Sequence, residues 1–163
     1  MSSLQIGFSF FQGGLAMEIC YSPLAGKTVN LDHVADEMFS QRMLGDGIAV
    51  EPEASEIYSP VAGEITMVYE TQHAIGIKTE KDVEILLHIG IDTVMLGGTP
   101  FKTKVQVGDH VRPGDLLTLV DWDYIWKKGC DTIVPILAIN RKVKLLKGEE
   151  NVKPGEALFE IEA

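Results

Sequence analysis

The sequence predicts an all-β protein, an antiparallel β-sandwich or barrel with internal duplication and only short helices. Short apolar runs recur between Gly, Pro and Asp residues, at 47–50, 64–69, 74–78, 83–91, 116–120, 132–139 and 157–161. Strands of this length and spacing, bounded by turn residues, are typical of sandwiches and barrels. Helical patterns are scarce, and we expect only two short helices, at 34–44 and 124–128.

Two pairs of repeated segments support the duplication. The run YSPLAG at 21–26 returns as YSPVAG at 58–63, and VRPGDLL at 111–117 returns as VKPGEAL at 152–158. Proline restricts φ and glycine permits a positive φ, so both repeats have the composition of tight turns between strands. Repeats of this kind predict an internally duplicated structure.

Length, composition and charge limit the classes of function that this chain can have. A chain of 163 residues with 45% hydrophobic and 23% charged residues is typical of one globular domain. A net charge of -10 disfavours nucleic acid and anionic lipid and favours a basic protein partner. Without a secretory signal or an apolar run near the roughly 20 residues of a membrane span, we expect a cytoplasmic protein with no direct membrane insertion. Residues 1–17 have no clear period and are expected to form a loose extension before a domain at 18–163.

The most informative segment is 71–94, which reads as a hairpin containing two histidines. An even loop centred between Glu80 and Lys81 would pair His73 with His88, with their Cβ atoms about 4.5–5.5 Å apart, whereas an odd loop would separate them. Two adjacent imidazoles resist double protonation, so one stays neutral and can act as a nucleophile while the other donates a hydrogen bond. Thr71 shares the face of His73, where its hydroxyl can fix the ring tautomer.

Four motifs carry a family resemblance: GDGIA at 45–49, SPVAG at 59–63, ETQHA at 70–74 and LHIGIDTV at 87–94. In this order and spacing the chain, from about residue 18 onward, resembles the glucose-type enzyme IIA domain of the bacterial phosphoenolpyruvate-dependent sugar phosphotransferase system. The resemblance implies that His88 accepts a phosphoryl group on Nε2 from the carrier protein HPr and passes it to a cysteine of an enzyme IIB domain. It also implies that His73 stabilises the phosphoryl group, that Thr71 orients His73, and that no metal or other cofactor is needed.

The same resemblance implies a surface for partner proteins. The residues that fall on its apolar rim are Phe39, Met43, Leu44, Tyr69, Leu86 and Val94, and those that fall where acidic groups meet a partner's arginine are Asp36 and Asp92. In a helix over 34–44, Phe39 and Met43 would share a face, which core packing would also produce. We favour the rim, because exposed apolar patches usually mark interfaces.

Three other classes of protein share some features of this sequence. A zinc endopeptidase of similar topology is suggested by His88-x-x-x-Asp92, but the sequence lacks the H-x-H pair that such a site requires. A biotin or lipoate carrier module is suggested by the Pro-Gly turns, but its modified lysine tip is missing. A non-catalytic regulatory binding protein of the same fold remains an alternative, because such a protein could contain His88 without using it.

Overall fold

The computed structural model describes residues 17–162, so the extension expected at 1–17 lies outside the described residues except for Met17. Within that range the strands form three antiparallel sheets. The largest has the order β10 (His110–Val111), β6 (Gly63–Val68), β7 (Ala74–Lys78), β8 (Glu84–His88), β12 (Val134–Ile139), β4 (Gly45–Pro52), β3 (Gly26–Val29) and β14 (Asn151–Val152). The second has β5 (Glu56–Tyr58), β11 (Leu116–Val120) and β9 (Phe101–Thr103), and the third has β13 (Val143–Leu145), β15 (Ala157–Ile161) and β2 (Glu18–Tyr21). The predicted all-β class is confirmed.

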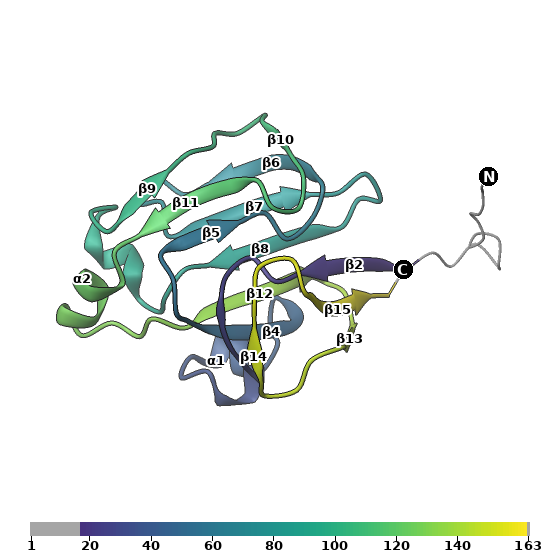
Figure 1. Ribbon diagram of the computed structural model, residues 1–163, viewed down its shortest axis with the longest axis horizontal. Coiled ribbons are helices and arrows are strands. Elements are labelled where there is room, and N and C mark those ends of the chain that lie inside the picture. The colour runs from purple at the N-terminus through teal and green to yellow at the C-terminus, as the bar shows by residue number, and fades with distance from the viewer. Residues whose placement is uncertain (1–16, 163) are drawn as a thin grey trace.

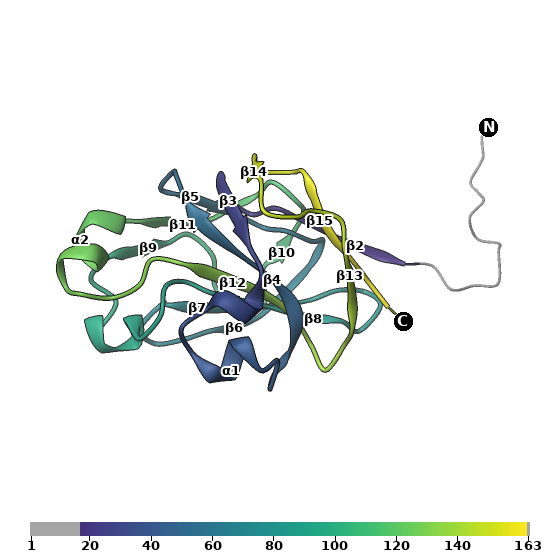
Figure 2. The same ribbon diagram turned by 90° about the horizontal axis from the view of Figure 1, so that it is seen from below.

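The sheets are arranged as a sandwich. Figures 1 and 2 together show that the sheet of β5, β11 and β9 lies over the β6 to β8 part of the large sheet. Side chains from the two layers meet in the main core, where Ile57 and Leu117 face Ile65 and Ile75 and all four are fully buried. Burial of this apolar surface stabilises the fold by roughly 25 cal/mol for each Å² removed from water. The predicted sandwich is therefore confirmed.

Several strands coincide with their predicted ranges. The predictions at 74–78, 116–120 and 157–161 match β7, β11 and β15. The strand predicted at 83–91 is too long, because β8 ends at His88 and Gly90 then turns the chain with a φ of 77°. That left-handed conformation cannot continue a strand, which requires a negative φ.

The helices are short, as predicted: η1 (Leu31–His33), α1 (Glu37–Ser40), η2 (Thr93–Leu96) and α2 (Trp122–Lys127). None of the helices in the described range is long and apolar enough to cross a membrane. The helix predicted over 34–44 is wrong, because α1 stops at Ser40. Arg42 then adopts a φ of 55°, its N–H donates to Phe39 O, and the N–H of Met43 donates to Met38 O. This pattern is a Schellman helix end with arginine where glycine is usual, so the sequence carried no visible stop signal.

The repeated segments occupy equivalent places in the fold. The N–H of Tyr21, in the first repeat, donates to the carbonyl of Pro60 in the second at 3.0 Å. Reciprocally, the N–H of Tyr58 donates to the carbonyl of Pro23 at 2.7 Å. The exchange relates the two repeats by an approximate two-fold axis, as a duplicated structure would show.

The register predicted for the hairpin of β7 and β8 is wrong. His88 pairs with Ala74 and not with His73, and Ile77 pairs with Ile85. The pairing has shifted by one residue from the prediction. In a regular strand such a shift moves a side chain to the other face of the sheet.

The hairpin loop explains the shift, because it holds an odd number of residues. Asp82 adopts a φ of 66°, and its N–H donates to Thr79 O. The N–H of Thr79 in turn donates to Val83 O, which closes the loop. A turn followed by one left-handed residue is a common odd hairpin loop, and aspartate tolerates that conformation without the glycine that would have marked it.

Candidate functional site

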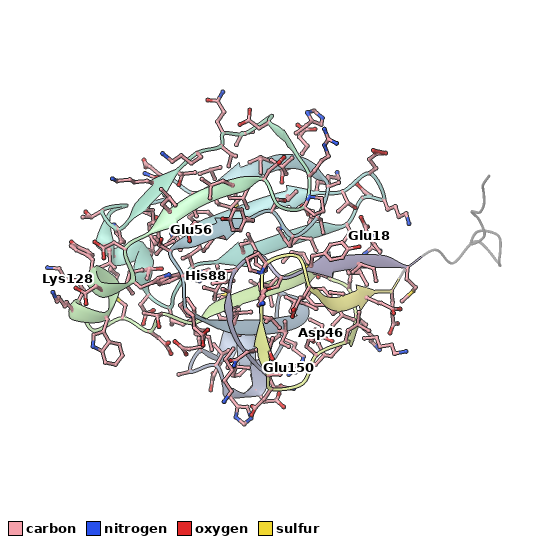
Figure 3. All side chains as sticks on the ribbon, in the orientation of Figure 1. Glu18, Asp46, Glu56, His88, Lys128 and Glu150 are labelled. Atoms are coloured by element: carbon pink, nitrogen blue, oxygen red, sulfur yellow. The ribbon has the colours of Figure 1, made fainter. Side chains whose placement is uncertain are left out.

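His88 ends β8 and is held by a turn that follows it directly. Its Nδ1 lies 2.7 Å from the carbonyl oxygen of Gly90. A carbonyl can only accept, so Nδ1 carries the proton and the lone pair of the neutral ring is on Nε2. Figure 3 labels His88 at the end of β8, on the side of the molecule where α2 lies. The turn therefore leaves the lone pair of Nε2 available to react or to accept a hydrogen bond.

His73 meets His88 despite the shifted register. It lies just before β7 and follows Gln72, whose φ of 61° breaks the strand, so the alternation of β7 does not set its direction. Its ring centroid is 5.0 Å from that of His88, with the planes at 79°. Its Nδ1 lies 2.7 Å from Thr71 Oγ1. The predicted closeness of the two imidazoles is thus confirmed, although the pairing used to predict it is wrong.

Two aromatic rings flank the histidine pair. The centroid of Phe39 lies 4.9 Å from that of His88, and that of Tyr69 lies 5.0 Å from that of His73 in an edge-to-face arrangement. Ring contacts of this kind restrict how far each imidazole can tilt. The four rings make a continuous row with both histidines in the middle.

Both imidazoles favour their neutral form. Burial is the main cause that lowers the pKa of His73 to about 4, and the charge of a protonated His88 lowers it further. Burial also lowers the pKa of His88, against the opposing effects of the Gly90 carbonyl and of the negative charges on Asp36 and Asp92. At pH 7 each ring therefore has one nitrogen with a lone pair and one that carries a proton.

The pair lies in an open depression of about 460 Å³ with mainly apolar walls. Of the residues predicted on its rim, those that line it are Phe39, Leu44, Tyr69, Leu86 and Val94. Met43 does not line it, because the helix end at Arg42 directs the chain away, and its side chain is 70% exposed. Phe39 is only 1% exposed and also packs in a second apolar core cluster, so it belongs to the core as well as to the wall.

Part of this wall was not predicted from the sequence. The additional lining residues include Met38, Thr66, Met67, Glu84 and Ile139. Glu84 and Leu86 alternate with His88 along β8, so a period of two counted back from His88 would have found Glu84. Gly76 pairs with Leu86 and lines the same face, which a correct register would have indicated.

The two predicted acidic residues sit at helix starts beside His88. Asp36 caps α1, where its carboxylate accepts from the N–H of Met38 at 2.9 Å. Asp92 precedes η2 and has a φ of 63°. Within residues 17–162, no group of three or more His, Cys, Asp and Glu side chains is placed to hold a metal ion.

Comparison with known proteins decides the family. Residues 18–144 match the family described as phosphoenolpyruvate-dependent sugar phosphotransferase system, EIIA 1. The chain belongs to this family. A solved structure of glucose permease IIA from Mycoplasma capricolum is similar to this EIIA, with 36% sequence identity and a TM-score of 0.87. The alignment covers 94% of this chain and 99% of that one.

The family membership confirms the predicted resemblance and activity. This glucose-type EIIA is a phosphocarrier of the sugar phosphotransferase system and works by transferring a phosphohistidine-bound phosphoryl group in sugar uptake. The depression fits that activity, because it brings a neutral histidine and a second imidazole together in apolar surroundings. A phosphoryl group placed between them would be partly shielded from water.

Proposed function

We propose that His88 is the phosphoryl acceptor of this EIIA. The observation that carries the proposal is the bond from Nδ1 to the Gly90 carbonyl, since it leaves the lone pair on Nε2. The donor is the phosphohistidine of HPr, and the acceptor in the next step is a cysteine of an enzyme IIB domain. In each step one bond to phosphorus forms as another breaks, and the leaving side chain keeps the electron pair. Such transfer depends mostly on positioning and on stabilising the charge of the phosphoryl oxygens.

His73 stabilises the phosphoryl group and Thr71 orients His73. Nδ1 of His73 lies 2.7 Å from the Thr71 hydroxyl. In the proposed role the hydroxyl donates to Nδ1, and the proton of the neutral ring is then on Nε2. The 5.0 Å between ring centroids brings that N–H close to a group bound on His88. A hydrogen bond to a charged oxygen is stronger than one between neutral groups, which favours the phosphorylated state.

The walls of the depression form the surface that both partners cover. Tyr69 and Val94 are about half exposed and lie at its edge, where they can pack on a partner and exclude water. The carboxylates of Asp36 and Asp92 lie near enough to His88 to affect its pKa. We infer that these carboxylates bind an arginine on a partner. We further propose that residues 18–163 form the working domain and that the protein acts in the cytoplasm.

Phosphorylation by purified components tests the acceptor. The protein is incubated with enzyme I, HPr and phosphoenolpyruvate, and mass spectrometry follows an acid-labile gain of one phosphoryl group. We expect His88→Ala to lose the gain and His33→Ala to keep it, because the His33 side chain is exposed and its Nε2 lies 3.9 Å from a Glu149 carboxylate oxygen, outside the depression. Phosphate acceptance by His88→Ala would contradict the assignment, and no acceptance by the unaltered protein would favour the non-catalytic binding protein.

The same assay tests His73. In His73→Gln we expect phosphorylation to persist and onward transfer to enzyme IIB to slow, since glutamine keeps a donor but not the ring geometry. Onward transfer at the rate of the unaltered protein would contradict the role of His73. The matched variant is Thr71→Val, which removes the hydroxyl at Nδ1 and should slow the same step.

A further inference from the structure

The place of the Gly90 carbonyl decides which nitrogen of His88 carries the proton. The carbonyl belongs to the turn that follows β8, and three backbone bonds hold this turn. The N–H of Ile89 donates to His73 O at 2.7 Å, that of Gly90 to Ile133 O at 3.0 Å, and that of Ile91 to Asp131 O at 2.9 Å. These bonds restrain the turn through its N–H groups.

One side chain restrains the turn through a carbonyl. The Thr93 hydroxyl donates to the carbonyl oxygen of Ile89 at 2.5 Å. The peptide between Ile89 and Gly90 is therefore tied at both ends, with its C=O on Thr93 and its N–H on Ile133. A peptide plane held at both ends cannot rotate without breaking a buried hydrogen bond, which is costly.

Thr93 also packs against Gly90 itself. A Cβ added to Gly90 would lie 2.5 Å from the Thr93 methyl carbon, so that methyl occupies the space beside the glycine. Gly90 has a φ of 77°, so its left-handed conformation depends on what surrounds it. Thr93 is fully buried and is not among the residues lining the depression. It can reach His88 only through the turn.

We propose that Thr93 is a positioning residue for phosphoryl transfer: by holding the peptide before Gly90, it keeps the Gly90 carbonyl on Nδ1 of His88 and the lone pair on Nε2. The proposal rests on the proposed function, in which His88 is the acceptor. The hydroxyl is the essential part, because it donates to the Ile89 carbonyl, while the methyl group adds packing.

Three variants separate the effect of the Thr93 hydroxyl from that of its methyl group. Thr93→Val keeps the shape and removes the hydroxyl, whereas Thr93→Ser keeps the hydroxyl and removes the methyl. The matched control is Thr28→Val. Thr28 is also a fully buried threonine whose hydroxyl bonds to backbone carbonyls, those of Gly148 and Glu150, but it lies on β3 away from the histidines. Both valine variants should lose stability, so stability does not distinguish them.

The deciding measurement is the tautomer of His88, read from the ¹⁵N chemical shifts of its ring nitrogens in the unphosphorylated protein near neutral pH. We expect a pure Nδ1–H form in the unaltered protein, in Thr93→Ser and in Thr28→Val, and a mixture of tautomers in Thr93→Val. Phosphorylation by HPr should slow about 10-fold or more in Thr93→Val, because the nucleophilic nitrogen is misplaced or protonated. Should Thr93→Val fail to fold, Thr93→Ala replaces it with the same expected tautomer mixture.

A pure Nδ1–H form in Thr93→Val, or the same tautomer mixture in Thr28→Val, would overturn the proposal. The tautomer measurement needs neither HPr nor phosphate. If His88→Ala still accepts phosphate, the proposed function fails. The tautomer of His88 in Thr93→Val is measured independently of that result, so the two failures can be distinguished.

Discussion

Replacing His73 by glutamine should make the protein less sensitive to acid. In the folded state burial and His88 lower the pKa of His73 to about 4, whereas an unfolded chain has a histidine pKa of about 6.5. Between these two values the unfolded chain binds a proton that the folded protein excludes. The free energy of unfolding therefore falls as the pH drops from about 6.5 to about 4, and His73 has no further effect outside that window.

The size of the effect follows from the two pKa values. Each unit of difference is worth about 1.4 kcal/mol, so the full window amounts to about 3 kcal/mol. At pH 5 about 2 kcal/mol of this contribution has already been lost, and about 1 kcal/mol remains. Glutamine does not titrate, so His73→Gln removes this part of the loss. His88 titrates in both proteins, and its contribution largely cancels in the comparison.

Urea unfolding at pH 7.5 and pH 5 measures this difference. We expect the unaltered protein to lose about 2 kcal/mol more than His73→Gln between the two conditions. The matched control is His33→Gln, which should lose as much as the unaltered protein because His33 is exposed. Equal losses in the unaltered protein and His73→Gln would refute the reasoning, as would an NMR titration in which His73 gains its proton near pH 6.5.

Three further predictions concern the turn, the rim and the core. Gly90→Ala should lower the free energy of unfolding by about 3 kcal/mol, since the new Cβ would clash within 2.5 Å at a positive φ. Gly108→Ala, at a φ of 98° with open space around it, should cost only about 1 kcal/mol, with both variants measured by urea unfolding at pH 7.5. Val94→Glu should raise the KM for phosphorylated HPr about 10-fold by placing a charge in the interface, whereas Met95→Glu, outside the depression, should not; equal effects would remove Val94 from the interface. In the native protein a thiol reagent should modify the half-buried Cys130 but not Cys20, because burial raises the pKa of the Cys20 thiol. Both cysteines should react in urea.

The strands that sequence analysis predicted correctly are those whose pattern is local. β7, β11 and β15 have apolar runs bounded by polar or turn residues, so their ends can be read from neighbouring positions. The two-residue strands β10 and β14 carry no such pattern, because a period of two needs several residues to be visible. They exist as strands only because Gly63 and Gly26 provide partners elsewhere in the chain.

The predictions that failed depend on single backbone angles. Asp82 and Arg42 both adopt a positive φ without being glycine. One makes the hairpin loop odd, and the other ends the helix before Met43. The Arg42 guanidinium bonds to Asp32 and Asp46 after the chain has folded around it. The residue types alone do not reveal these positive φ angles, because most arginine and aspartate residues adopt a negative φ.

The motifs that identify the family, with their two histidines and one threonine, can be read in the sequence of this β-rich chain of net charge -10. How the histidines meet depends on the folded backbone. The break at Gln72 frees His73 from the alternation of β7, and the Gly90 carbonyl determines which nitrogen of His88 carries the proton. Both are properties of a folded backbone, because each requires groups that are brought together by pairing between strands.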